Sequence, residues 1–264
     1  MKVLDIFSGI GGFSLGLERA GMETVAFCEI DPFCQKVLRK HWPEVPIYDD
    51  VRKLTRERLE ADGITGIEVI TGGFPCQDIS IAGKQAGIDG ERSGLWPDLA
   101  RIISDIQPQF AIVENVTALL SGDRGRWFGR VLGDLAEIGY DAEWHCIPAA
   151  AIGAPHIRDR VWVLAYPGQK HGRITRRTNS PSRCPYLLSK RNNGGTSERS
   201  QDWELTPLVS GIHQRVAEDW WRTQSRMDRS VDGIPDTIHR NCALGNAVVP
   251  QIPELIGRVI MESE

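Results

Sequence analysis

The sequence predicts an α/β fold, a mostly parallel sheet with helices on both faces. Short apolar segments alternate with amphipathic segments through residues 1–165, and several apolar segments end at glycine-rich or polar turns. Strands that alternate with helices are typical of parallel sheets. The chain has 264 residues, 41% hydrophobic and 25% charged, which fits a soluble globular protein with one large domain or a large and a small one.

The expected elements follow from periodicity and from glycine and proline. A helix after the first strand places Phe13, Leu17 and Ala20 on one side and stops at Gly21. Pro32 begins a second helix. The expected strands cover residues 3–7, 24–28, 68–71, 110–113 and 161–165, and a terminal helix follows residue 250.

The composition changes after residue 166. Residues 168–201 have almost no apolar periodicity, which is typical of a disordered surface loop or of a segment without a core of its own. We therefore divide the chain into a catalytic and cofactor-binding domain (1–165), a small and partly irregular basic region (166–228) and a C-terminal segment (229–264).

The charge is unevenly distributed. The net charge is −4, yet residues 166–230 contain twelve Lys or Arg and six Asp or Glu, so this window carries +6 and the rest carries −10. An acidic protein can still present one basic face to a polyanion such as nucleic acid.

Several classes of protein are excluded by composition. The sequence contains no run of 18 apolar residues, so no membrane span is predicted. Asp5 interrupts the N-terminal apolar stretch, so no secretory signal is predicted. The six cysteines form no CxxC pair, which argues against a zinc site and a disulfide framework and favours the reducing cytoplasm.

Two features favour an adenosine-containing cofactor. Residues 8–12 (Ser-Gly-Ile-Gly-Gly) form a glycine-rich turn between an expected strand and helix, although such turns often serve only tight packing. Glu29 ends the next strand, about 20 residues further on, where an acid commonly holds ribose hydroxyls. Spacing alone leaves a dinucleotide and S-adenosylmethionine both open.

The candidate nucleophile is Cys76, which follows a strand end within Gly-Gly-Phe-Pro-Cys (72–76). A buried structural cysteine is the alternative. Glu114 favours the catalytic interpretation, because it ends the next expected strand and parallel strands share one carboxyl edge. Strand alternation also places Arg158 and Arg160 on one face, either toward this crevice or on a solvated edge.

Five segments together resemble the DNA cytosine-5 methyltransferase family, in its bacterial or phage form with a short target-recognition region. They are residues 5–13, 73–77, 114–116, 157–161 and 245–250. The resemblance covers nearly the whole chain except about 166–225. His156 and Ile157 stand where the family usually has Gln and Arg, which reduces the support for the nearby loop.

The resemblance implies a role for each catalytic candidate. Cys76 adds to carbon 6 of a cytosine that is flipped out of duplex DNA, which makes carbon 5 able to accept a methyl group. Glu114 binds N3 and the exocyclic amine of the ring. Arg160 binds O2, and Arg158 supports the loop.

The resemblance also implies a Rossmann-like methyltransferase fold that uses S-adenosylmethionine and no metal. Phe7 faces the adenine, Glu29 takes the ribose hydroxyls, and the C-terminal segment packs back near the first strand. The implied cofactor-binding residues are Phe7, Gly9, Gly11, Gly12, Glu29, Ile30, Asp50, Val51, Pro75, Leu95, Asn246 and Val248.

The resemblance implies two partners, double-stranded DNA and a cognate restriction endonuclease. It also implies a monomeric enzyme that acts in the cytoplasm, at the nucleoid of a bacterial or phage-infected cell. The basic region 166–228 is then the target-recognition region. Two alternatives share the fold: an enzyme acting on RNA cytosine, and a catalytically silent DNA-binding relative. Gln77 fits the DNA branch better, and Cys76, Glu114 and Arg160 are residues that a mere binder does not need.

Overall fold

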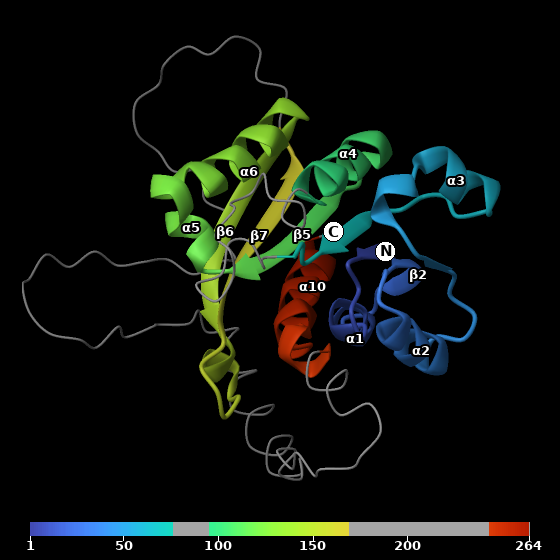
Figure 1. Cartoon of the computed structure of the whole chain (residues 1–264), viewed down its shortest axis with the longest axis horizontal. Helices are drawn as coiled ribbons and strands as arrows, with labels where there is room; N and C mark the ends of the chain where they lie inside the picture. Colours follow the sequence, from blue (N-terminus) through green and yellow to red (C-terminus); the bar gives the residue numbers. More distant parts are fainter. Residues whose placement is uncertain (76–94, 169–242, 264) are drawn as a thin grey trace, which may run out of the picture.

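The computed structural model describes residues 1–75, 95–168 and 243–263 (Figure 1). Within them one sheet has seven strands in the order β3-β2-β1-β4-β5-β7-β6. The strands are β1 (Lys2–Ile6), β2 (Glu23–Cys28), β3 (Ile47–Tyr48), β4 (Val69–Gly72), β5 (Phe110–Val116), β6 (Tyr140–Pro148) and β7 (Asp159–Pro167). The α-helices are α1 (Gly12–Arg19), α2 (Pro32–His41), α3 (Arg56–Ala61), α4 (Trp96–Ile106), α5 (Ala118–Ser121), α6 (Arg126–Glu137) and α10 (Gln251–Ser263).

The predicted mostly parallel sheet is confirmed. β1 pairs in parallel with β2 and β4, while β3 extends the sheet beyond β2 and β5 extends it beyond β4. β7 lies between β5 and β6 and is antiparallel to both. The chain order reverses at β1, whose two neighbours come later in the sequence, and such a reversal opens a crevice at the carboxyl edge of a sheet.

Helices cover both faces of the sheet, as predicted, and each face has its own core (Figure 1). On one face, α1 and α10 bury Leu17 and Ile256 against Val3 of β1. On the other face, α4 and α6 bury Leu99 and Val131 against the apolar side of the central strands. The sheet is therefore shielded from water on both sides, which is the usual state of a parallel sheet.

Local sequence signals explain where the first helices begin and end. Asp31 caps α2 by accepting hydrogen bonds from the backbone N–H groups of Phe33 and Cys34, and Pro32 occupies the first turn. After α1 the chain turns at Gly21, whose φ is +95°. Both observations confirm the predicted boundaries.

Two expected strands are longer in the structure, and two were not foreseen. β5 continues through Glu114 to Val116, so Glu114 lies within a strand and not in a turn after it. This extension forms because β7 supplies antiparallel partners for the polar residues at the end of β5. β7 runs from Asp159 to Pro167, beyond the expected 161–165, while β3 and β6 were not predicted.

The C-terminal segment returns to the first elements of the chain, as the resemblance implies. α10 lies beside α1 (Figure 1). A Cβ atom at Gly257 would lie 2.8 Å from Cβ of Ala20 and 2.9 Å from Leu17, so a side chain there would keep the helices apart. The basic region falls almost entirely outside the described residues.

No helix in the described ranges combines the length and the apolar character that crossing a membrane requires.

Candidate functional site

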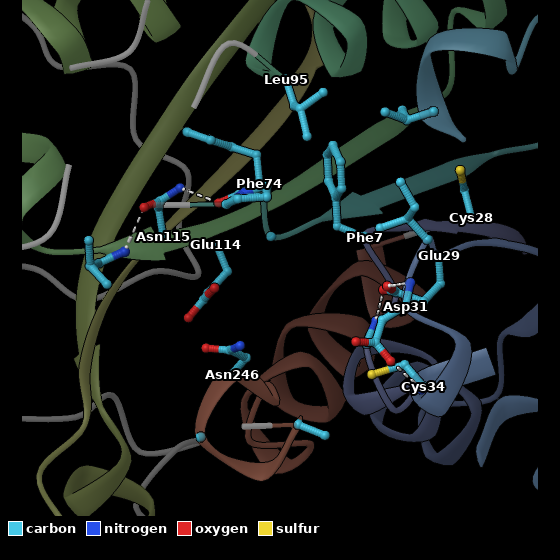
Figure 2. A pocket seen from close by; sticks show the side chains of 18 of the residues that line it. Phe7, Cys28, Glu29, Asp31, Cys34, Phe74, Leu95, Glu114, Asn115 and Asn246 are labelled. Carbon is cyan, nitrogen blue, oxygen red and sulfur yellow. Dashed lines mark hydrogen bonds between the residues drawn. The ribbon is translucent and has the colours of Figure 1, made fainter. Parts of the chain in front are cut away.

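A cavity of about 670 Å³ opens at the carboxyl ends of β1, β4 and β5, where the sheet order reverses (Figure 2). Twelve of the residues proposed from the sequence line it. They are Phe7, Gly9, Glu29, Ile30, Asp50, Val51, Pro75, Leu95, Glu114, Arg158, Arg160 and Asn246. Side chains that lie far apart in the chain therefore share one space, which has a Glu–Arg end and a Phe–Glu end.

At the first end, the buried Glu114 forms an ion pair with the partly buried Arg160. The Nε atom of Arg160 lies 3.1 Å from Oε1 of Glu114, and Glu114 is 9% exposed. The strand register brings them together, since Arg160 stands opposite Val116 and Glu114 stands two residues earlier on the same face of β5. Burial raises the pKa of Glu114, while the Arg160 and Arg158 guanidinium groups oppose that rise.

Asn115 fixes the backbone that precedes the candidate nucleophile. Its Nδ2 donates a hydrogen bond of 3.0 Å to the carbonyl of Phe74, and its Oδ1 accepts one from the N–H of Val116 (Figure 2). The ring of Phe74 packs on Trp96 with centroids 5.5 Å apart. Residues 73–75 are thus held beside Glu114, and Cys76, the next residue, lies outside the described residues.

The two described cysteines of the cavity are poor nucleophiles. Cys28 and Cys34 both line the cavity (Figure 2). Burial and, as a smaller effect, the nearby Glu29 carboxylate raise the pKa of each thiol to about 12. Because the thiolate is the reactive form of cysteine, neither side chain is suited to attack a substrate near neutral pH.

At the second end, Glu29 connects two turns. Its Oε2 accepts a hydrogen bond of 2.7 Å from the N–H of Gly9, and its Oε1 accepts one of 2.8 Å from the N–H of Asp31 (Figure 2). Burial raises the pKa of Glu29, and these bonds act against the rise. Phe7, with φ of +56°, and Gly9, with φ of +54°, shape the neighbouring turn.

This end offers carboxylate acceptors and apolar side chains, which suit an adenosine group. Each oxygen of the Glu29 carboxylate accepts one hydrogen bond from the protein and has capacity for another, such as a hydroxyl. The Phe7 ring and the apolar Leu95 and Val51 side chains border the same space. Asp50 lies beside them, and its carboxylate is bound by Nε of Arg52 at 2.8 Å, which lowers its pKa.

Three of the proposed cofactor-binding residues are absent from the lining of the cavity and pack against other parts of the protein. A Cβ at Gly11, whose φ is +87°, would lie 2.6 Å from the Trp42 ring. A Cβ at Gly12 would lie 2.5 Å from the carbonyl oxygen of Val248. The absence of side chains at these glycines thus allows close packing, and Val248 is the partner of one of them.

Arg158 and Asn246 join the cavity to the C-terminal segment. Arg158 donates hydrogen bonds from Nη1 to the Gly245 carbonyl at 2.7 Å and from Nη2 to the Ala247 carbonyl at 2.6 Å. Its φ of +36° shows that strand geometry does not position it, in contrast to the predicted alternation with Arg160. Asn246 lies between the two bonded residues and lines the cavity.

Sequence reasoning missed several cavity residues that position others. Asp31 acts as a helix cap, and its place directly before Pro32 was the available signal. Asn115 was visible only as a neighbour of Glu114, and nothing in the sequence indicated its bond to Phe74. Arg52 pairs with Asp50 two residues away, a local contact that no periodicity reveals.

Comparison with known proteins shows which family the sequence of this chain resembles. Residues 1–246 match the family described as C-5 cytosine-specific DNA methylase. The Type II methyltransferase M2.BsuMI of Bacillus subtilis (strain 168) is 40% identical over 169 residues, which cover 62% of this chain and 42% of that protein. The Type II methyltransferase M.NgoMIV of Neisseria gonorrhoeae is 26% identical over 310 residues, which cover 98% and 97% of the two. The chain spans about half the length, or less, of several such relatives.

Solved structures share the fold. The Entamoeba histolytica methyltransferase EhMeth aligns over 100% of this chain and 98% of its own, with a TM-score of 0.62 and 17% identity. At that identity the likeness concerns the fold alone. Together with the seven-stranded sheet, it confirms the Rossmann-like methyltransferase fold that the resemblance implies.

Proposed function

Because this chain belongs to the C-5 cytosine-specific DNA methylase family, we propose that it is a DNA (cytosine-5-)-methyltransferase that uses S-adenosylmethionine. The observation that carries the proposal is one cavity with two chemically different ends. The Glu114–Arg160 pair suits a polar heterocycle, and Phe7 with Glu29 suits an adenosine group. A methyl donor and a base bound at these ends would share a single space.

The Glu114–Arg160 end supports recognition of cytosine. A raised pKa favours the protonated form of Glu114, and in that form the side chain can donate to N3 of the ring and accept from the exocyclic amine. Arg160, which is an obligate donor, is suited to O2 of the same ring. A cytosine inside a duplex cannot reach the buried Glu114, and the base must therefore be flipped out.

Cys76 is the proposed nucleophile. Its thiolate adds to carbon 6 of cytosine, and Glu114 stabilises the ring as electron density moves to carbon 5. S-adenosylmethionine supplies the methyl group that carbon 5 accepts. Loss of the carbon-5 proton and departure of the Cys76 thiolate then complete the reaction. Asn115 supports this role because it holds the Phe74 carbonyl two residues before Cys76.

The residues proposed to hold the methyl donor lie at the second end and along the cavity. Glu29 would accept hydrogen bonds from ribose hydroxyls, and Phe7 would contact the adenine ring. Val51 and Leu95 add apolar contact, and the Asn246 amide enters from the C-terminal segment. The remaining cavity residues in this proposed set are Gly9, Ile30, Asp50 and Pro75.

Double-stranded DNA is the proposed macromolecular substrate. Both relatives named above are Type II methyltransferases, and the excess of arginine and lysine in residues 166–230 provides cations for phosphate contacts. We further propose a cognate restriction endonuclease as the functional companion and the cytoplasm as the place of action.

The test is cytosine-conversion sequencing of plasmid DNA from methylation-deficient cells that express the chain or its Cys76→Ala variant. Protected cytosines at one short sequence, absent in the variant, are expected. The purified proteins are also given duplex DNA or RNA with S-adenosylmethionine carrying a labelled methyl group. Label in RNA alone would transfer the proposal to the RNA alternative, and full activity of Cys76→Ala would refute the nucleophile assignment.

A further inference from the structure

Arg158 lies where the cavity meets the C-terminal segment 243–250. Its two terminal nitrogens bind the carbonyls of Gly245 and Ala247, which stand two residues apart. A guanidinium presents its donors in a fixed planar fork and can serve two acceptors at once, whereas an ammonium is a point charge. The contact therefore depends on the shape of the arginine as well as on its charge.

The residue between the two bonded carbonyls is Asn246, which lines the cavity (Figure 2). Fixing the carbonyls on both sides of a residue restricts its backbone, and thereby the direction of its side chain. Figure 2 shows the Asn246 amide extending from the C-terminal segment into the space below Glu114. Arg158 is thus placed to set the position of Asn246.

Helix α1 restrains the same segment from a second side. A Cβ at Gly12 would lie 2.5 Å from the Val248 carbonyl oxygen, and one at Gly16 would lie 2.2 Å from that of Pro250. Val248 and Pro250 thus pack tightly against α1, while Arg158 binds the carbonyls of Gly245 and Ala247. The Arg158 contact consists of directed hydrogen bonds from a side chain.

The backbone of Arg158 indicates that this contact is favourable enough to oppose strain. Its φ of +36° lies in the left-handed region, which is strained for a non-glycine residue. Such a conformation persists only where surrounding contacts hold it. The two charge-assisted bonds to the 243–250 segment are contacts of that kind.

We propose that Arg158 is a positioning residue for methyl-donor binding, which fixes segment 243–250 so that Asn246 points into the cavity. This inference rests on the proposed function. It separates two arginines that the sequence pattern groups together: Arg160 acts at the Glu114 end, and Arg158 acts through Asn246. Changing Arg158 therefore alters the affinity for the donor more than the rate at saturating donor.

The decisive variant is Arg158→Lys, which keeps a positive charge near Glu114 but loses the fork. Isothermal titration of the full chain with S-adenosylmethionine is expected to show about tenfold weaker binding, the effect of losing one charge-assisted hydrogen bond. Under steady-state conditions KM for the donor rises by a similar factor, and kcat changes less than about threefold. Hydrogen exchange across 243–250 becomes faster.

A double-mutant cycle distinguishes positioning from general destabilisation. If Arg158 acts through Asn246, adding Arg158→Lys to Asn246→Ala weakens donor binding no further. Arg160→Lys is the matched control, expected to lower kcat while leaving donor affinity and exchange in 243–250 unchanged. Arg158→Gln, which has one amide nitrogen in place of the two terminal nitrogens that bind the carbonyls, repeats the test should the lysine variant fail to fold.

The outcomes are separable. Donor binding by Arg158→Lys equal to wild type, or effects of Arg158→Lys and Asn246→Ala that multiply, would overturn the positioning role while leaving the proposed function intact. A wild-type chain that binds no S-adenosylmethionine would contradict the proposed function itself.

Discussion

Burial and two guanidinium groups act on Glu114 in opposite directions. Burial raises its pKa, and Arg160 is the largest influence that lowers it. Replacing Arg160 by Gln removes that influence, so the pKa of Glu114 should rise further. Carbon-13 NMR of the carboxyl groups over a pH series measures this change, and Glu114→Gln assigns the signal. An unchanged or lower pKa in the Arg160 variant would show that the ion pair is not formed in solution.

The same residue offers a catalytic prediction. A glutamine at position 114 preserves the size of the side chain but cannot exchange a proton with the ring. Methyl transfer should therefore fall by about 10²- to 10⁴-fold, the usual contribution of a positioned acid or base. Single-turnover kinetics at saturating DNA and donor measure the loss. Activity near the wild-type value would contradict the role proposed for Glu114.

Asp5 is a buried acid whose carboxylate is bound by neutral hydroxyl groups. Its carboxylate accepts hydrogen bonds from the Ser14 and Thr71 hydroxyls at 2.8 Å each, and burial raises its pKa from 3.8 to about 7. Between these values the folded protein holds a proton that the unfolded chain has released. The contribution of Asp5 to stability is therefore complete below pH 3.8 and is lost as the pH rises toward 7.

Asp5→Asn should remove this pH dependence. The stability of the variant relative to wild type is expected to grow by up to about 1.4 kcal/mol per pH unit between pH 4 and 7 and to level off above. Urea denaturation of both proteins at four pH values measures the difference. A constant difference across that range would mean that Asp5 ionises normally.

At the residue scale, sequence reasoning located side chains but not their contacts. Phe7, Glu29 and Asn246 line the cavity, because glycine turns and strand ends place such residues at the sheet edge. Gly11 and Gly12 follow the same pattern, yet they accommodate Trp42 and Val248, which lie far away in the chain. A glycine leaves room either for a ligand or for another part of the protein. The tertiary packing decides between the two, and local sequence patterns do not reveal it.

At the scale of elements, the contact between α1 and the C-terminal segment depends on an absent side chain. A Cβ at Gly16 would lie 2.2 Å from the Pro250 carbonyl oxygen. Gly16→Ala should therefore destabilise the fold by about 1–3 kcal/mol, despite the better helix propensity of alanine. Gly133→Ala in α6 is the matched control, because its Cβ meets nothing within 4 Å, and should stabilise by about 0.5–1 kcal/mol. Chemical denaturation compares the two, and equal effects would refute the packing explanation.

The strands that sequence analysis found and missed differ in composition. The apolar segments of β1, β4 and β5 were predicted because both of their faces are buried. β6 was missed although Asp141, Glu143 and His145 alternate with apolar residues along it, which is the pattern of a half-exposed edge strand. β3 has only two residues, Ile47 and Tyr48, which is too short for a periodic signal.

At the scale of the whole molecule, the two ends of the chain share one core. Ile256 of α10 is 5% exposed and belongs to the same cluster as Val3 and Leu17. Ile256→Ala should lower the stability by about 2–5 kcal/mol and shift a single unfolding transition that includes β1. Unfolding followed by circular dichroism, with hydrogen exchange of β1, tests this. Separate melting of α10 before β1 would contradict a shared core.

The general architecture could be predicted, while its strand order could not. Alternating strand and helix patterns predicted a mostly parallel sheet with covered faces, and the structure confirms it. The antiparallel insertion of β7 between β5 and β6 depends on pairing between Glu114 and Trp162, about 50 residues apart in the chain. Contacts at that separation have no local signature.

The contact between Glu114 and Arg160 depends on the register in which β5 pairs with β7. Arg160 stands opposite Val116, which lies two residues from Glu114 on β5, so that the two side chains project from the same face of the sheet. Substitutions elsewhere in β7 would leave this register, and the face on which Arg160 lies, unchanged. One residue inserted between Arg160 and Trp162 would turn the guanidinium to the other face of the sheet, so this stretch should accept exchange of side chains but not a change in length.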